Sequence, residues 1–484
     1  MPVRRLRDLV ERGLRRSDRR PTGLCTDYST FLRFYRNNVA MTTTRALNSL
    51  VRFSFSNVRS FRDDASISFE ATRMVEPGVA RAVPWRADGA TLQVLPVAGV
   101  FGANASGKTS VLRAMADMRG LVLGSFRHGG QGTAIPRRPF RLDPASVELP
   151  SHFEVDVVMS GVRWQYGFDV TDAEVVTEYA YRFPKGRQSL VFERDGGSFQ
   201  FGASMRPVGR MLEKITRRNS LLLSVAGATA DSELAPLFEW FAANLKLAEA
   251  DSRGIRAART VELVESSQRE RVLAMIRAAD LGVTEVRRES ADPEFVDRMR
   301  RAIRILNGVD GEPDGSDAEH FVVEDFVRLT HCGADGCAEL DPDEESLGTL
   351  VWIGIIGPVI DALDGGDVLL ADELDASLHP RLGEQLIRLF QDAATNPNGA
   401  QLIFNAHNPV FLGDSAERPI GRDQIWIAEK ANDGSSRMYS LAEFSPRQDE
   451  ALGRRYLQGR YGGVPVIDPS GFDRAAEPVE LASV

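Results

Sequence analysis

The sequence predicts an α/β fold built around a phosphate-binding loop, with an antiparallel β subdomain and a helical insert. Three observations lead to this fold class. A glycine-rich loop at residues 102–109 lies between strand-like and helix-like sequence. An apolar run, Val368–Ala371, ends in two carboxylates, as a buried strand beside a ligand site does. Alternating apolar and polar residues from Phe153 onward predict a β-meander.

The composition is that of an ordinary globular protein. The 484 residues predict two or three domains. Hydrophobic residues make up 43% and charged residues 26%, which excludes a disordered, collagenous or purely coiled-coil chain. The net charge of −9 excludes a general nucleic-acid coat but leaves room for a local basic groove.

Cysteine usage and hydropathy bear on the compartment. Cys25, Cys332 and Cys337 are too few for a disulfide framework, so we expect a reducing, cytoplasmic location. The longest apolar run, Leu350–Ile360, is too short to span a bilayer and predicts a buried helix. We therefore expect no membrane partner, and the arginine-rich N-terminus lacks the apolar core of a signal peptide.

The first forty residues differ from the rest of the chain. Residues 1–40 hold ten arginines and four acids, a net charge of +6. One interpretation is a basic arm that contacts nucleic acid. The other is that the start codon is mis-assigned and that translation begins at Met41. We expect mass spectrometry of the native protein to find the N-terminus at or just after Met41. A peptide that covers Arg4–Arg20 would contradict this.

The predicted organisation follows the change of pattern along the chain. After the basic extension 1–40 come four parts: 41–117 with the phosphate loop, the β-meander 118–230, the helical insert 231–320, and 321–484 with the acidic strand. The predicted strands are 51–55, 65–69, 92–100, 153–159, 162–170, 179–183, 189–193, 321–331 and 401–406. The predicted helices are 104–115, 232–247, 294–306 and 350–363, and 308–317 reads as a surface loop.

The glycine-rich loop carries the clearest chemical signal. Its residues fit the pattern G-x-x-x-x-G-K-[ST] in full: Gly102, Ala103, Asn104, Ala105, Ser106, Gly107, Lys108 and Thr109. Glycines let main-chain N–H groups wrap a phosphate, and the following helix adds partial positive charge at its N-terminus. We expect Lys108 to reach the β- and γ-phosphates and the Thr109 hydroxyl to bind Mg²⁺.

Two carboxylates complete the predicted site far downstream. Asp372 and Glu373 follow the buried strand Val368–Ala371. Asp372 is the candidate Mg²⁺ partner, and Glu373 is the candidate general base for an attacking water. The roles separate because a metal neutralises one carboxylate, while the other stays free to accept a proton.

Two weaker signals flank these carboxylates. His407 ends the next predicted strand, where it could sense a γ-phosphate by a hydrogen bond, although a lone histidine is usually structural. Ser346 and Gly348 precede the helix Leu350–Leu363 and could form a second anion site. Ser346 is equally suited to a simple helix cap.

These four elements, in this order, resemble the ABC-type and SMC-like ATPase heads of the P-loop NTPases. Gly102–Thr109 then corresponds to Walker A, Val368–Glu373 to Walker B, Ser346–Thr349 to the signature loop, and His407 to the switch histidine. The stretch Leu374–Pro380 resembles the D-loop. The match is closer to bacterial AAA-family ATPases with SMC-like heads, found beside restriction and abortive-infection genes and including RloA-like proteins. It covers about residues 51–467, and segments 53–61, 374–380 and 424–430 resemble that branch too.

Two positions depart from the ABC pattern. Leu347 stands where ABC signatures usually have glycine. His379 replaces the usual D-loop aspartate, although the SMC-like branch often has this Leu-His-Pro sequence.

The resemblance implies a mechanism. Two heads would sandwich two ATP molecules with Mg²⁺, and Ser346 of one head would complete the site of the other. Binding of ATP closes the pair, and hydrolysis by Glu373 releases it. The expected protein is an ATPase that forms a homodimer or higher homo-oligomer and controls a nuclease or toxin partner in anti-phage, abortive-infection defence.

Other functions stay open at this stage. A RecF-like DNA-repair ATPase predicts turnover stimulated by DNA, with nucleic acid as the partner. A scaffold that only binds ATP predicts full biological activity without hydrolysis. The arginines at 287, 288, 298, 300, 301 and 304 form either a phosphate-binding ridge or a solvated helix face. The segment His331–Cys337 reads as a hairpin turn rather than as a zinc knuckle.

Overall fold

The computed structural model describes residues 48–86, 88–128, 130, 132–229, 233–248, 253–289, 326–413 and 418–476. All features below belong to the compact unit Ala46–Val484. The basic extension 1–40, the predicted helix Glu294–Leu306 and the predicted loop Gly308–Asp317 lie outside the described residues.

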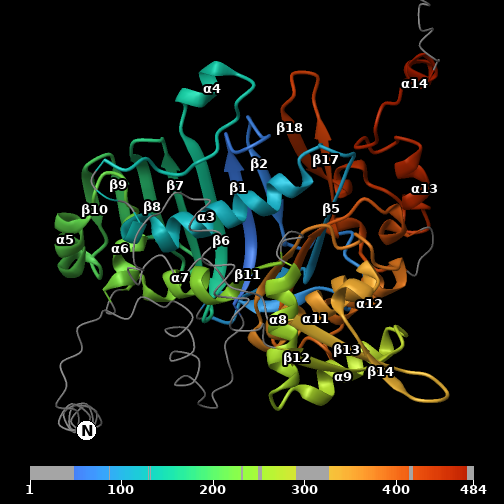
Figure 1. Cartoon of the computed structure of the whole chain (residues 1–484). Coiled ribbons are helices and arrows are strands. Elements are labelled where there is room, and N and C mark those ends of the chain that lie inside the picture. Colours follow the sequence, from blue (N-terminus) through green and yellow to red (C-terminus); the bar gives the residue numbers. More distant parts are fainter. Residues whose placement is uncertain are drawn as a thin grey trace, which may run out of the picture. The chain divides into compact units, whose positions relative to one another are not determined.

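A six-stranded sheet carries the phosphate loop. Its order is β11 (Leu245–Ala248), β15 (Val368–Ala371), β16 (Gln401–Asn405), β5 (Val97–Phe101), β17 (Ile425–Lys430) and β18 (Ser436–Ser440). The first five strands run parallel, and β18 pairs antiparallel with β17. Every residue of β5, β15 and β16 is buried, as expected for parallel strands covered on both faces. The carboxyl ends of these three strands therefore meet at one edge (Figure 1).

The predicted β-meander is confirmed as part of an antiparallel seven-stranded sheet. Its order is β10 (Ser198–Phe201), β9 (Ser189–Asp195), β8 (Val175–Arg182), β7 (Val162–Val170), β6 (Ser151–Met159), β1 (Ser49–Ser56) and β2 (Ala65–Ser68). Helix α3 (Lys108–His128) shares one buried core with both sheets, because Val111 and Met115 belong to the same buried cluster as Phe153 of β6 and Ile403 of β16.

A second core covers the other face of the six-stranded sheet. It includes α8 (Arg253–Val264), α9 (Arg269–Ala278), α11 (Leu347–Gly365) and α12 (Pro380–Gln391). Among the described residues, α11 alone is long and apolar enough to cross a membrane, but 67% of its most apolar stretch is buried inside the protein. This agrees with the buried helix predicted at Leu350–Leu363.

Two predicted elements differ from the structure. The strand expected at Leu92–Val100 is split into β4 (Thr91–Val94), which pairs with β3 (Arg81–Pro84), and β5. Pro96 lies at the break, and proline has no N–H to donate to a sheet ladder.

The prediction of a helix at Ser232–Leu247 is also wrong at its C-terminal end. Helix α7 (Ala235–Glu239) and a π-turn (Trp240–Asn244) lead into strand β11, which pairs with β15. Tertiary pairing has overridden the helical spacing of the apolar residues.

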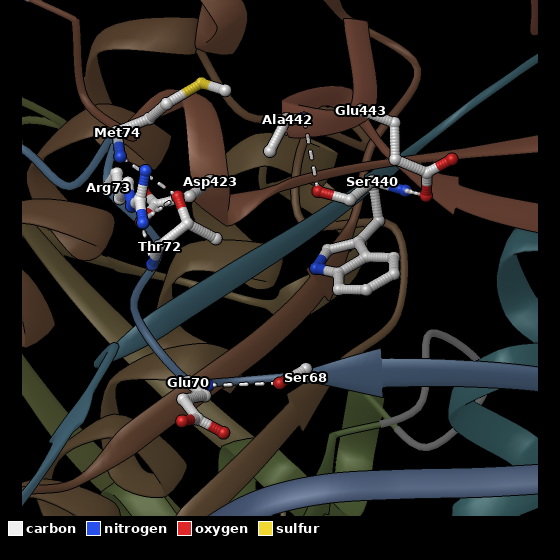
Figure 2. A pocket seen from close by; sticks show the side chains of 10 residues that line it. Ser68, Glu70, Thr72, Arg73, Met74, Asp423, Ser440, Ala442 and Glu443 are labelled. Atoms are coloured by element: carbon white, nitrogen blue, oxygen red, sulfur yellow. Dashed lines mark hydrogen bonds between the residues drawn. The ribbon is translucent and has the colours of Figure 1, made fainter. Parts of the chain in front are cut away.

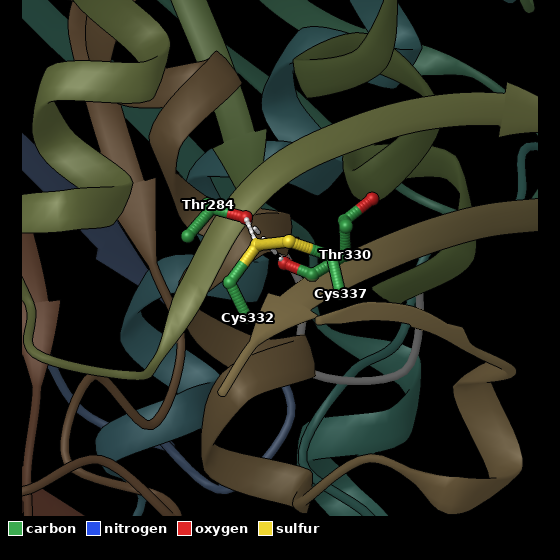
Figure 3. The surroundings of a disulfide bond; sticks show 4 residues. All are labelled: Thr284, Thr330, Cys332 and Cys337. Carbon is green, nitrogen blue, oxygen red and sulfur yellow. Dashed lines mark hydrogen bonds between the residues drawn. A yellow bond between two sulfur atoms is a disulfide. The ribbon is translucent and has the colours of Figure 1, made fainter. Parts of the chain in front are cut away.

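A small sheet contains the two C-terminal cysteines. Strands β12 (Val283–Glu289), β13 (Phe326–Cys332) and β14 (Cys337–Leu340) form it, so the predicted hairpin turn is confirmed. Cys332 and Cys337 face each other across β13 and β14 and form a disulfide (Figure 3). The low cysteine count had indicated a reducing compartment, and this bond removes that support. Sulfurs bonded to each other are not available as zinc ligands.

Candidate functional site

Close packing shapes the phosphate loop. Ala105 and Gly107 have φ angles of 59° and 108°, so the loop turns in the left-handed region. A Cβ on Gly107 would lie 2.5 Å from Ser436 Oγ of β18, which leaves room only for glycine. A Cβ on Gly463, near the end of the described chain, would lie 3.5 Å from Cα of Gly102. The C-terminal segment thus lies beside the loop on one side.

Lys108 lies at the start of α3 with its ammonium folded over the loop. Its Nζ donates hydrogen bonds to the carbonyl oxygens of Gly102 (2.9 Å) and Ala103 (2.8 Å). Burial lowers the pKa of the Lys108 ammonium to about 8, although three nearby carboxylates oppose this shift. The His407 ring also lies here, with Nδ1 3.3 Å from Nζ of Lys108.

Thr109, Asp372 and Asn405 form a hydrogen-bonded cluster. The Thr109 hydroxyl donates to Asp372 Oδ1 at 3.0 Å, and the Asn405 amide nitrogen donates to the same oxygen at 2.6 Å. Strand β16 lies between β5 and β15, so Asn405 at its end bridges the loop after β5 and the carboxylate after β15. Asp372 is 8% exposed and Asn405 is fully buried, so the cluster is held rigidly.

Glu373 is positioned through its backbone. It adopts a φ of 53°, an unusual conformation for a residue other than glycine that costs roughly 1–2 kcal/mol. The Glu373 N–H donates to the side-chain oxygen of Asn405, which stabilises this turn. Its carboxylate is exposed and has no hydrogen-bond or ion-pair partner among the described residues, whereas Oδ1 of the adjacent Asp372 accepts two hydrogen bonds.

Asp375 fixes the segment that carries His407. Asp375 Oδ2 accepts hydrogen bonds from the backbone N–H groups of His407 (2.8 Å) and Asn408 (2.7 Å). Its other oxygen, Oδ1, is buried and has no partner among the described residues. The predicted D-loop and the predicted switch histidine are therefore joined directly.

The structure does not join Ser346 and Gly348 to this site within one chain. The Ser346 hydroxyl caps α11 by accepting a hydrogen bond from the Thr349 N–H at 3.1 Å. A Cβ on Gly348 would lie 2.7 Å from the carbonyl oxygen of Ser377, so this turn packs on the D-loop. Ser346 is exposed, and across the described ranges no hydrogen bond links it or Gly348 to residues 102–109.

The residues present fit a nucleoside triphosphate with Mg²⁺. The first N–H groups of α3 have no acceptor within the helix, and the Ser106 hydroxyl is buried without a partner among the described residues. These donors, with Lys108, suit phosphate oxygens. Thr109 and Asp372 offer oxygen ligands 3.0 Å apart, which is the donor chemistry that Mg²⁺ requires.

Sequence reasoning missed Asn405 and Asp375. For Asn405 a signal was available, because this polar residue ends the apolar run Leu402–Phe404 and a buried amide needs hydrogen-bond partners. Asp375 carries no signal of its own, because its partners are backbone N–H groups from another part of the chain.

Comparison with protein families identifies the chain. A family model described as "AAA domain, putative AbiEii toxin, Type IV TA system" matches residues 97–413, more than half of the sequence. The chain belongs to this AAA-domain family. The match runs from β5 to the segment after His407, so it contains every residue of the cluster described above.

This AAA domain is a nucleotide-binding ATPase domain. The predicted α/β fold of a P-loop NTPase with an antiparallel β subdomain is confirmed. No curated protein matches the chain significantly. A solved structure of an SMC head bound to the C-terminal winged-helix domain of ScpA is similar, with 11% identity and a TM-score of 0.35. The similarity covers 82% of this chain and 99% of that chain.

A hollow of about 420 Å³ lies apart from these residues. It opens between the end of β2, the segment that follows β2, and β18, and none of the predicted site residues lines it. Figure 2 shows Thr72 beside Asp423 on one side and Ser440 with Glu443 on the other. Asp423 accepts a hydrogen bond from the Thr72 N–H at 3.1 Å, and Glu443 accepts one from the Ser440 N–H.

Proposed function

We propose that the protein hydrolyses ATP with Mg²⁺ and that ATP-driven pairing of two heads controls a toxin or nuclease partner. In this proposal main-chain N–H groups of 102–109 and Lys108 bind the phosphates, while Thr109 and Asp372 hold Mg²⁺. Glu373 accepts the proton of the attacking water, and His407 contacts the γ-phosphate.

The main support for the proposal is that the adjacent carboxylates of Asp372 and Glu373 have different surroundings. Asp372 accepts hydrogen bonds from Thr109 and Asn405 and is buried, which suits a metal ligand. Glu373 is turned outward by a left-handed backbone, and its carboxylate is free to accept a proton. A site that only bound nucleotide would not need a free carboxylate beside the metal ligand.

Pairing of two heads is supported by the exposed signature turn. Ser346 and the 49% exposed Leu347 lie at the surface and have no hydrogen bond to the phosphate loop of their own chain. The turn packs on the D-loop, which leads directly from Glu373, so a second head that docks there would reach the catalytic segment.

The defence role is supported by the family alone. Its description names a putative AbiEii toxin of a type IV toxin–antitoxin system. We propose that the protein is the ATPase component of such a cytoplasmic system and that its partner is a nuclease or a toxin.

A Glu373→Gln substitution tests turnover. Phosphate release should fall by about 10²–10⁴-fold, because the general base is lost, while ATP binding is kept. The control is Glu270→Gln, which removes an exposed carboxylate from α9 and should leave turnover unchanged. Equal turnover in the two variants would contradict the role of Glu373.

Light scattering tests pairing. With ATP and Mg²⁺ the Glu373→Gln protein should double in mass, and a further Ser346→Arg substitution should restore the monomer. A mass that does not respond to ATP would contradict head pairing without affecting the hydrolysis result. If Glu373→Gln keeps full biological activity in cells, hydrolysis is not the function, and ATP acts only as a structural ligand.

A further inference from the structure

A hydrogen bond from a distant strand holds the residue that precedes the signature turn, residues 346–348. His331 Nε2 of β13 lies 2.7 Å from Oε1 of Glu345, and an ionised carboxylate only accepts, so the ring donates this bond. The Glu345 side chain is 4% exposed, and His331 is its only side-chain partner among the described residues. A buried carboxylate needs such a partner, so His331 fixes the residue next to Ser346, the N-cap of α11.

His331 is held by the small sheet and not by the signature helix. It pairs with Val283 of β12, and a Cβ on Gly282 would lie 3.4 Å from its Nδ1. Leu329, two residues earlier on the same face of β13, is fully buried in the second core. His331 therefore lies where β13 leaves this core and continues into an exposed hairpin with β14.

The disulfide closes this hairpin directly after His331. Cys332 and Cys337 are both exposed, and each residue of β14 is at least partly exposed. The Thr284 hydroxyl of β12 donates to the Thr330 carbonyl oxygen at 3.0 Å and lies 3.4 Å from the Cys332 sulfur (Figure 3). The end of β13 is thus fixed by β12 on one side and by the disulfide on the other.

We propose that His331 positions the signature turn and that the Cys332–Cys337 disulfide controls how firmly it does so. The disulfide constrains Cys332, and the adjacent His331 binds Glu345. Glu345 in turn adjoins Ser346. Head pairing, as proposed above, underlies this inference, because Ser346 acts there on the nucleotide of the other head. The disulfide state strengthens ATP-driven pairing, and the dithiol state weakens it.

Both states are accessible to an exposed disulfide. A dithiol reductant gives it two electrons and two protons, so that two cysteine thiols form while the reductant becomes a disulfide. In the cytoplasmic system proposed above, the thiol pool opposes structural disulfides, and those that form are usually catalytic or redox-sensing. The candidate site uses neither sulfur, so a sensing role fits this bond better than a catalytic one.

Sedimentation equilibrium of the full chain tests the control by the disulfide. The parent protein carries Glu373→Gln, is purified in the disulfide form, and is measured with ATP and Mg²⁺ in the absence and presence of dithiothreitol. The reductant should raise the dissociation constant for pairing about fivefold, part of what a hydrogen bond to a charged group contributes. Cys332→Ser with Cys337→Ser should show the higher constant under both conditions. Cys25→Ser, which keeps the disulfide, should respond as the parent does.

Substitution of His331 tests the positioning role. His331→Ala in the disulfide form should weaken pairing about tenfold, and dithiothreitol should then add less than about twofold, because the contact it acts through is gone. His331→Gln keeps a donor and should recover most of the loss. The matched control is His152→Ala, since His152 of β6 is 29% exposed and contacts a carboxylate, Asp169, at 2.9 Å. It should leave pairing within about twofold.

Hydrogen exchange without nucleotide tests the contacts independently of pairing. Dithiothreitol should speed exchange in the hairpin 332–340 and also at the Thr349 and Leu350 N–H groups, which donate to Ser346. Faster exchange confined to 332–340 overturns the proposal, because the disulfide then acts only on its own hairpin. Equal loss of pairing in His331→Ala and His152→Ala also overturns it, as does a parent whose pairing does not respond to dithiothreitol. A parent that never pairs contradicts the proposed head pairing instead, and the exchange result still decides whether the disulfide acts on the signature turn.

Discussion

Replacement of Asn405 by alanine would separate the scaffold of the site from its chemistry. The Asn405 side chain donates to Asp372 and Thr109 and accepts from the Glu373 N–H. The substitution therefore frees the proposed metal ligand and the proposed general base in one step, without touching either side chain.

The size of the effect follows from these bonds. The hydrogen bond to the Asp372 carboxylate is worth about 1.5–3 kcal/mol, and that to the Glu373 N–H about 1 kcal/mol. We expect the free energy of unfolding to fall by about 3 kcal/mol. Turnover should fall by about 10–100-fold, because a residue that orients a metal ligand typically has this effect. Binding of ATP, which depends mainly on the loop 102–109, should change much less.

A matched control lies just before the start of the same strand. Asn396 is also buried and makes three hydrogen bonds, to Phe390 and Ala400, but it precedes β16. Asn396→Ala should lose similar stability in urea unfolding and keep its turnover. The assays are steady-state phosphate release and urea unfolding of both variants. If both lose turnover equally, the loss reflects stability alone, and the positioning role of Asn405 is refuted.

Two other substitutions have defined outcomes. Arg194→Leu leaves the buried Glu178 carboxylate without its cation, 3.7 Å away, and should lower stability by about 3–5 kcal/mol in urea unfolding. Burial raises the pKa of Glu178, so the stability deficit should shrink as the pH falls and the carboxyl takes up a proton; a pH-independent deficit would contradict this. Gly348→Ala places a Cβ 2.7 Å from the Ser377 oxygen and should reduce turnover about tenfold with near-normal unfolding. Unchanged turnover would mean that the contact with the D-loop has no functional role.

The sequence predicts the parts of the site that are local. The loop 102–109 is recognised because one short segment contains the strand, the glycines and the helix start. The carboxylates at 372 and 373 are recognised because they end an apolar run. Asn405 is not recognised, because its role depends on the position of β16 between β5 and β15. No single segment of the sequence determines this strand order.

The misassigned elements have the same origin. Leu245–Ala248 has helical spacing, but its strand conformation depends on hydrogen bonds to β15, more than 100 residues later. The Cys332–Cys337 bond depends on the register of β13 and β14, which a count of cysteines ignores.

Gly463 lies close to Gly102 of the phosphate loop, although the two residues are far apart in the sequence. The ribosome makes the glycine-rich turn early and its neighbouring wall some 360 residues later. A nascent or prematurely ended polypeptide therefore carries the ATP-binding motif without the surroundings that shape it. The loop therefore gains this part of its surroundings only after residue 463 has been synthesised.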